Sequence, residues 1–529
     1  MNRSEEVVLA DHYVELFDTG KLNGRLELLE ALNLKWFRLN TLYKIKVKEP
    51  AINAAGKKTF VVRFRPNRAQ RIRYVSRHNR DLILKARQLG FTTFEMIDAL
   101  DDCLFTENFN AGCIAHALDD AKSIYRNKIR FAYENIPASW LAILDTLGFV
   151  MPTPLSDKSE GYVFSNGSSI HVSTGYRGGT LQRLHVSEFG KICRKYPEKA
   201  EEIVSGAFEA VPLDGQITIE STAEGREGRF YQYSTEAQVA LQQGSKLTPL
   251  DFRFHFFPWW EESDYSMSPE GVVIDSKLTD YFKSLEKVIG QTLTAGQKAW
   301  YAKKAAVLKD KMKREYPSTP EEAFEQAIEG AYFTTQMALI REKKQIRSVP
   351  YDHRLPVYTF WDLGRNDFTA IWFMQHAWGE YRMIRYYENN GENIQFYCRK
   401  LREFEYHYST VYLPHDAAVT DYSNADNMSR RDIVQSMGFG VEVVPRCSDK
   451  REAIQAARDI LPQCWFDETL CATGIAHLDS HRKDWNDATG NWKDEPFRGP
   501  AKHAADALEQ MARGFAVMSS GESYEPEIA

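Results

Sequence analysis

The stretch from Leu82 to Thr93 constrains the fold more than any other part of the chain. An apolar run, Leu82-Ile83-Leu84, leads into a loop with Gly90 and two threonines, and apolar positions at helical spacing follow. Such a loop can bind a phosphate, because its N–H groups and the helix N-terminus face the anion. The usual pattern, G-x-x-x-x-G-K-[ST], has a lysine where this chain has Phe91. The stretch therefore indicates either an unusual phosphate loop or an ordinary strand-to-helix turn.

Strands and helices alternate after this loop. The helix predicted behind it has Asp98, Asp101 and Asp102 on the side opposite its apolar positions. Further strands are expected at residues 111–116, 184–188 and 216–220, with a helix over 119–133. This order predicts a parallel sheet covered by helices, with ligands at the carboxyl ends of the strands.

Two of these strands end in polar residues. In nucleotide hydrolases of this architecture, a strand beside the phosphate loop ends in acids that organise magnesium and position the attacking water. Glu188 fits the second role, and Ser187 could hold a magnesium-bound water, although it lacks charge. Ser221 and Thr222 follow the strand at 216–220 and suit either a γ-phosphate sensor or a turn.

The second half of the chain predicts another sheet. A strand at 357–361 precedes Asp362, two antiparallel strands and a helix follow, and a fourth strand precedes Asp416. A late helix carries Asp506. This is the element order of the ribonuclease-H type fold. Several carboxylates are needed to hold two divalent ions against their mutual repulsion, so we expect a metal site here rather than three helix or strand caps.

Composition limits the alternatives. A chain of 529 residues suggests two large domains, and a net charge of −6 means that any nucleic-acid surface is local. Nine Lys/Arg and no acid between Lys57 and Arg80 indicate either a solvated basic face or phosphate contacts.

Seven cysteines without a C-x-x-C pair favour a reducing compartment. With no membrane-length apolar run, we expect a soluble intracellular protein.

These motifs together resemble the large terminase subunit of tailed bacteriophages, from about Gln70 to Gly514. Pro66-Asn67-x-x-Gln70 resembles the family's adenine-contacting motif, and Arg87-Gln88-Leu89-Gly90-x-Thr92-Thr93 its phosphate loop. Leu184–Glu188 resembles the acid-ended strand, and Glu220–Gly225 the motif that couples hydrolysis to movement. Tyr316–Phe324 is similar to the segment before the inter-domain linker, and Asp362-Leu363-Gly364, Asp416 and His503–Ala507 to the nuclease triad.

The resemblance implies an α/β fold with a P-loop (ASCE/RecA-like) ATPase domain, mainly parallel, followed by a ribonuclease-H-like nuclease domain with a mixed sheet. The implied organisation is an N-terminal appendage (1–60), the ATPase domain (61–335), a linker (336–350), the nuclease domain (351–515) and a flexible acidic tail (516–529). The implied activities are ATP-driven translocation of double-stranded DNA and metal-dependent DNA cleavage.

The resemblance also implies specific site residues. The expected ATP-binding residues are Gln70, Lys85, Arg87, Gln88, Gly90, Thr92 and Thr93, with Thr92 and Ser187 at the ATP-bound Mg²⁺ and Ser221 and Thr222 in coupling. Glu188 would be catalytic, and Asp362, Asp416 and Asp506 would bind two Mg²⁺ or Mn²⁺. Arg177 is either an arginine finger or a turn residue. Whether Lys85 or Arg87 replaces the missing lysine stays open.

The partners implied by the resemblance are double-stranded DNA, the portal protein of the procapsid and the small terminase subunit. We expect a homo-oligomeric ring on the portal, a monomer in isolation, and no membrane association. The expected location is the host cytoplasm, with transient docking on the procapsid. Three alternatives remain: a DNA helicase or remodeller with an accessory nuclease, a non-catalytic docking protein with a degenerate nucleotide site, and a transposase-like strand-transfer enzyme.

Overall fold

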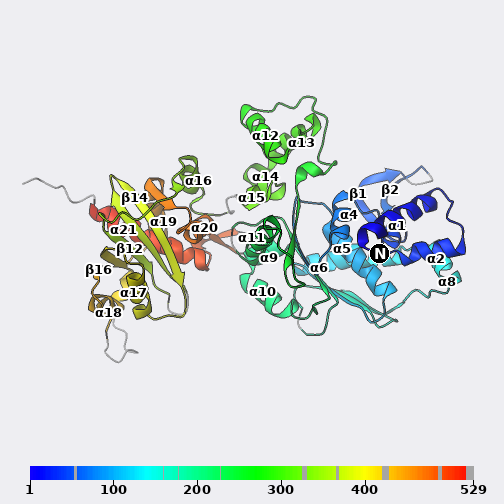
Figure 1. Cartoon of the computed structure of the whole chain (residues 1–529), viewed down its shortest axis with the longest axis horizontal. Helices are drawn as coiled ribbons and strands as arrows, with labels where there is room; N and C mark the ends of the chain where they lie inside the picture. Colours follow the sequence, from blue (N-terminus) through cyan, green and yellow to red (C-terminus); the bar gives the residue numbers. More distant parts are fainter. Residues whose placement is uncertain are drawn as a thin grey trace, which may run out of the picture. The chain divides into compact units, whose positions relative to one another are not determined.

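The computed structural model describes residues 1–52, 56–158, 160–176, 178–226, 228–324, 330–364, 368–419, 428–486 and 491–519. The chain divides into two compact units, Met1–Gln326 and Ala327–Ala529 (Figure 1). Within the described ranges, no helix is both long and apolar enough to cross a membrane.

The first unit contains a mainly parallel sheet, as predicted. Its described strands follow the order β10-β3-β9-β8-β4-β7-β6-β5, in which β10 to β7 are parallel and β6 and β5 antiparallel. Every residue of β3 and β8 is buried, as expected for parallel strands covered on both faces. The bounds are β3 Arg80–Lys85, β4 Asn110–Ile114, β5 Pro154–Lys158, β6 Gly161–Phe164, β7 Ser169–Ser173, β8 Arg183–Ser187, β9 Gln216–Ser221 and β10 Phe252–Phe257.

Helices surround this sheet, and a two-stranded ribbon, β1 (Lys44–Ile52) with β2 (Lys58–Arg63), precedes it. The main helices are α1 Arg3–Asp18, α2 Arg25–Asn33, α3 Lys35–Thr41, α4 Arg68–Val75, α5 Phe91–Phe105, α6 Leu118–Ile124, α7 Phe131–Glu134, α8 Ala138–Thr146, α9 Phe189–Lys195, α10 Pro197–Glu202 and α11 Gly228–Gln242. A π-helical segment, Tyr125–Arg130, joins α6 to α7. The helix predicted over 119–133 is therefore present as one continuous helical run, with a π-helical stretch in its middle.

A helical group follows the last strand of this unit. It comprises α12 Ser276–Ile289, α13 Ala295–Leu308, α14 Met312–Glu315 and α15 Pro320–Phe324 (Figure 1). Residues of α12, α13 and α14 share one apolar core with Phe91 and Phe257. Thr319 accepts a hydrogen bond from the Glu322 N–H at the start of α15.

The second unit has the predicted ribonuclease-H type sheet. Among its described strands, β12, β13 and β14 form an antiparallel meander, and β15 and β16 continue in parallel from β12, in the order β11-β17-β14-β13-β12-β15-β16. Strands β11 and β17, which extend the other edge, were not predicted. The bounds are β11 Ile346–Arg347, β12 Val357–Asp362, β13 Thr369–Ala377, β14 Glu380–Asn389, β15 Tyr408–Leu413, β16 Gly440–Val443 and β17 Cys464–Asp467.

Both faces of this sheet are covered. Phe360 and Trp372 pack into a core with α16, α19, α20 and α21, whereas Trp361 and Ile371 pack into a second core with α17 and α18. This alternation follows from the two-residue repeat of a strand. The helices are α16 Thr334–Glu342, α17 Ile394–Glu403, α18 Arg430–Ser436, α19 Lys450–Ile460, α20 Ala472–Ser480 and α21 Pro500–Ser519. Strand β18, Lys483–Asn486, pairs antiparallel with β19, Asn491–Pro496.

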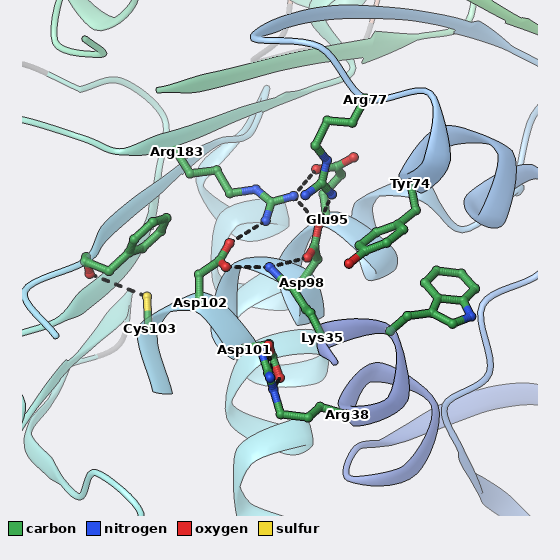
Figure 2. A network of polar contacts seen from close by, with 12 residues as sticks. Lys35, Arg38, Tyr74, Arg77, Glu95, Asp98, Asp101, Asp102, Cys103 and Arg183 are labelled. Carbon is green, nitrogen blue, oxygen red and sulfur yellow. Dashed lines mark hydrogen bonds and ion pairs between the residues drawn. The ribbon is translucent and has the colours of Figure 1, made fainter. Parts of the chain in front are cut away.

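Helix α5 carries a buried charge network that the sequence did not predict (Figure 2). Asp98 and Asp101 were expected on the polar side of this helix, yet both are fully buried. The expectation was wrong because α3 covers that side, where Lys35 pairs with Asp98 at 2.5 Å and Arg38 with Asp101 at 2.7 Å. A buried acid is tolerated when it is paired and hydrogen-bonded.

Arg183 of β8 stands at the centre of this network. Its guanidinium contacts Glu95 at 2.9 Å and Asp102 at 2.8 Å, and it also pairs with Asp98. Arg77, two residues after the end of α4, reaches Asp98 from another side, as Figure 2 shows. Elements α3, α5 and β8 and the turn after α4 are therefore joined by ion pairs.

The basic stretch between Lys57 and Arg80 was expected to be a solvated face or to contact phosphate, but two of its arginines, Arg73 and Arg77, have a different role. Both side chains are buried, and Arg73 pairs with Asp81 at 3.0 Å and with Glu95 at 3.4 Å. Burial lowers the pKa of Arg77 to about 9, and the neighbouring arginines contribute to the shift. These arginines hold the interior of the unit together.

Replacing Arg183 with Met should destabilise the first unit by about 3–5 kcal/mol, because it leaves several buried carboxylates without their cation. Arg229→Met is the matched control: Arg229 pairs with Glu201 on the surface, and its loss should cost less than about 1 kcal/mol. Chemical denaturation of both variants measures the difference. Equal costs would show that the buried network does not hold the unit together.

Candidate nucleotide and metal sites

The predicted phosphate loop joins β3 to α5 through two left-handed residues. Gln88 has φ 70° and Gly90, the N-cap of α5, has φ 74°. At Gly90, an added Cβ would also lie 2.8 Å from the Gln70 side-chain nitrogen. Glycine is therefore required there both by backbone conformation and by space.

Gln70 of α4 holds this loop in place through hydrogen bonds to its backbone. Its side-chain amide donates to the carbonyls of Leu89, at 3.2 Å, and Gly90, at 3.0 Å. Asn67, which caps α4, also donates to the Leu89 carbonyl, at 3.1 Å. In this structure Gln70 is a positioning residue for the loop, and its contact with an adenine ring stays a prediction.

Phe91 explains why the loop lacks its usual lysine. Its ring is buried and packs against Phe257 with centroids 4.8 Å apart. Position 91 thus faces the apolar core shared with the helical group rather than the loop. A charged side chain there would be buried without a partner, at high cost.

Lys85, Glu220 and Ser187 meet at the carboxyl ends of three neighbouring strands. The sequence suggested that the acid-ended strand, β8, lies directly beside the loop strand, β3. In the structure, strand β9 lies between them. Glu220 of β9 is the direct partner of Ser187 in the β8–β9 register. The carboxylate of β9 therefore stands between the other two strand ends.

Short contacts join these side chains to α5. The Lys85 ammonium lies 3.2 Å from Glu220 Oε2 and 3.8 Å from Glu188 Oε1. Thr92 Oγ1 donates to Glu220 Oε1 at 2.5 Å, and Ser187 Oγ lies 3.2 Å from that same oxygen and 3.2 Å from Thr92 Oγ1. Three of the predicted site residues, Lys85, Thr92 and Ser187, thus contact one acid, and Glu188 lies beside Lys85.

Charge pairing governs the ionisation of this cluster. Burial alone would lower the pKa of Lys85, but Glu220 and Glu188 outweigh it and raise that pKa above its ordinary value. Burial alone would raise the pKa of Glu220, but the charge of Lys85, the neighbouring His185 and the hydrogen bond from Thr92 hold it well below its usual range. Both groups are therefore charged at neutral pH.

Glu188 has a strained backbone. Its φ of 56° is left-handed, a conformation that costs a residue other than glycine about 1–3 kcal/mol and clusters at functional sites. It precedes α9, whose Lys191 lies 3.1 Å from its carboxylate. This turn directs Glu188 toward the Lys85 ammonium.

Arg87 lies away from this cluster. It is half exposed and pairs with Glu315 of α14 at 3.0 Å, and its own N–H donates to the Glu315 carbonyl at 2.8 Å. Gln88 is exposed and Thr93 half-buried. The structure therefore brings Lys85, not Arg87, to the strand ends.

The expected coupling residues lie directly behind Glu220. The hydroxyls of Ser221 and Thr222 are buried and have no hydrogen-bond partner among the described residues. Unpaired buried hydroxyls are uncommon, and a bound water or ion can satisfy them. Arg177 lies outside the described residues.

In the second unit, Asp362 and Asp506 come together at the end of β12. His503 of α21 contacts Asp362 through Nδ1 at 2.7 Å. Burial raises the pKa of Asp362, and the neighbouring Asp506 raises it further. Asp506 itself is paired with Lys450 at 2.5 Å and Lys502 at 2.6 Å.

Asp416 is not in contact with these two acids. It is exposed and lies in a short 3-10 helix, His415–Ala418, directly after β15. Strands β12 and β15 are parallel neighbours, so both end at the same edge of the sheet. In the described part of the chain, no three His, Cys, Asp or Glu side chains are close enough to hold a metal ion. Oxygen donors at one strand edge nevertheless suit Mg²⁺ or Mn²⁺. In this structure, the ammonium groups of Lys450 and Lys502 supply positive charge beside Asp506.

Several residues of these sites escaped sequence reasoning. The central position of Glu220 was missed because nothing in the sequence placed β9 between β3 and β8. Lys450 was missed because its helix lies more than fifty residues from its partner Asp506. The spacing of His503 and Asp506, three residues apart on α21, could have indicated that both face one cluster.

His481 predicts a pH effect on the second unit. Burial lowers its pKa to about 3, so between about pH 3 and its ordinary value of about 6.5 the unfolded chain binds the extra proton. Stability should consequently fall as pH falls through this window. His481→Phe, which can stack on Tyr332 and Phe333 as the histidine does, should flatten this dependence in denaturation curves between pH 7 and 4. An unchanged pH profile would mean that His481 takes up its proton at the same pH in the folded and the unfolded chain.

Comparisons with known proteins give structural matches only. No protein-family model matches the chain, and no curated protein does. Over 85% of this chain and 95% of the other, it is similar to the large terminase of bacteriophage HK97, at 11% identity and TM-score 0.41. It is similar to the large terminase of thermophilic bacteriophage D6E, in complex with ATP-gamma-S, at 13% identity and TM-score 0.28, over 82% of this chain and 93% of that one.

The nuclease of a phage terminase also matches alone. The large terminase nuclease of thermophilic phage G20c, with bound cobalt, covers 35% of this chain with 96% of its own length, at 14% identity and TM-score 0.26. The chain thus combines a mainly parallel α/β unit and a mixed α/β unit, and over most of its length it is similar to phage large terminases.

Proposed function

We propose that this chain is the large subunit of a viral DNA-packaging motor, which hydrolyses ATP to move double-stranded DNA into a procapsid and cuts concatemeric DNA. One observation carries the proposal: Lys85, Thr92, Ser187 and Glu188 converge at the carboxyl ends of neighbouring strands, beside a glycine loop that opens a helix. That is the position of ligands in open parallel sheets.

In the first unit, the loop N–H groups and the Lys85 ammonium would bind the phosphates of ATP. Lys85 is the loop cation in this proposal, since Arg87 is held by Glu315. Glu188, whose carboxylate reaches toward Lys85, would orient the water that attacks the γ-phosphate. Mg²⁺ held near Thr92 and Ser187 would neutralise charge that develops on the phosphates.

In the second unit, Asp362 and Asp506 would hold divalent ions for phosphodiester hydrolysis, with Asp416 completing the set. Two Mg²⁺ or Mn²⁺ supply charge stabilisation to the attacking and leaving oxygens. Lys450 and Lys502 balance the charge of Asp506, and His503 orients Asp362. Seating metal at this edge requires the Asp416 segment to approach the other two acids.

The partners of such a motor would be double-stranded DNA, the portal protein and the small subunit, with a ring of this chain on the portal. A helicase with an accessory nuclease is the nearest alternative, and strand separation on a forked duplex distinguishes it. A docking protein with a degenerate nucleotide site would show no ATP turnover.

Lys85→Ala should reduce ATP turnover at least a hundredfold, because it removes the ammonium beside Glu188 and Glu220. Arg87→Ala is the matched control and should change turnover less than about fivefold. Steady-state phosphate release in the presence of DNA measures both. The reverse order of effects would assign the role to Arg87.

Glu188→Gln should abolish ATP turnover and packaging but leave DNA cleavage intact, because the two sites lie in separate units. Asp362→Ala should do the opposite. Phosphate release and cleavage of a supercoiled plasmid with Mn²⁺ report the two activities independently. If both variants kept both activities, the proposed function would be wrong.

A further inference from the structure

We propose that Glu220 supplies the carboxylate that organises the magnesium ion of the bound nucleotide. This inference rests on the proposed ATP hydrolysis. It addresses a deficit in the site: Ser187 stands where a charged group is expected, and a hydroxyl cannot offset the charge of a divalent ion as a carboxylate does.

The strand register places a carboxylate next to this deficit. Glu220 and Ser187 are direct partners across the parallel β8–β9 pair. Since β9 lies between β8 and the loop strand β3, Glu220 is one strand closer to the phosphate loop than Ser187. A carboxylate on β9 can thus act at the magnesium position where a carboxylate on β8 was expected.

The hydroxyls expected at the magnesium ion both face this carboxylate. Thr92 Oγ1 and Ser187 Oγ contact the same oxygen, Glu220 Oε1, at 2.5 Å and 3.2 Å. One carboxylate and two hydroxyls form an all-oxygen donor set, the type that Mg²⁺ prefers, directly or through its water shell. These three side chains come from three elements, α5, β8 and β9, and converge on one point.

A purely structural role for Glu220 would be to neutralise Lys85, 3.2 Å away. That role does not account for the two hydroxyls, which contact Oε1 whereas Lys85 contacts Oε2. Glu188 also lies near the ammonium, at 3.8 Å. A fully buried carboxylate is costly to retain for one ion pair alone.

The test measures how Mg²⁺ changes nucleotide affinity, not turnover. Adenylyl imidodiphosphate binding is titrated by calorimetry on the full chain, with Mg²⁺ and with EDTA. The wild type should bind at least tenfold more tightly with Mg²⁺, and Glu220→Ser should lose most of this gain. The double variant Ser187→Asp with Glu220→Ser returns the carboxylate to β8 and should recover it.

Two further variants serve as controls. Glu220→Gln keeps the shape of the side chain and should also lose the gain, with weakened Mn²⁺ binding by electron paramagnetic resonance in the presence of the analogue. Glu224→Ser removes another buried acid nearby, paired with Arg194 at 2.7 Å, and should keep the Mg²⁺ gain. Thermal unfolding identifies any variant that is not folded.

The outcomes separate this inference from the proposed function. If Glu220→Ser and Glu220→Gln keep the wild-type Mg²⁺ gain, or if the folded double variant does not recover it, Glu220 does not serve magnesium, although ATP hydrolysis can still stand. If the wild type binds no analogue under either condition, the nucleotide site itself is refuted.

Discussion

The contacts of Arg183 with the acids of α5 are the constraint on which the first unit depends. A guanidinium buried among carboxylates is stable only if every partner is in place, since a buried charge without its counter-ion costs several kcal/mol. Arg183 lies four residues before Ser187 on β8, and its partners lie on the helix that begins at the proposed phosphate loop. The same ion pairs that stabilise the interior thus fix the position of α5 relative to the end of β8.

The N-terminal helices take part in this constraint. Lys35 and Arg38 of α3 pair with acids on α5, and the Asp101 carboxylate also accepts a hydrogen bond from Tyr43 at 2.8 Å. Burial lowers the pKa of Lys35 to about 8 despite the neighbouring Asp102. Residues 1–43 therefore complete the core of the unit, since without α3 the acids of α5 would face water.

Much of the architecture could be predicted from sequence, but less of each site. Apolar runs and helical spacing identified β3, α5 and β8 because local patterns reflect burial and periodicity. The buried acids of α5 could not be predicted, because their counter-ions come from three separate parts of the chain: α3, the turn after α4, and strand β8. The sequence identified Glu220 only as the first residue of a motif. Its position between the ends of β3 and β8 depends on the order of the strands, which is a property of the folded sheet. In the second unit the pattern indicated Asp362 and Asp506, but not the lysines that accompany Asp506.

The burial of Phe91 has a consequence for how phosphate loops diverge. Its ring belongs to the core formed with Phe257 and the helices of the helical group, so a lysine at that position would disrupt packing rather than restore the usual loop. Conversely, Lys85 is seated between two acids that would be left unbalanced if it were lost. Converting this loop, with its cation at Lys85, into the usual loop, with a lysine at position 91, would therefore require coordinated changes in several elements. Each single substitution on its own would leave a charge unpaired.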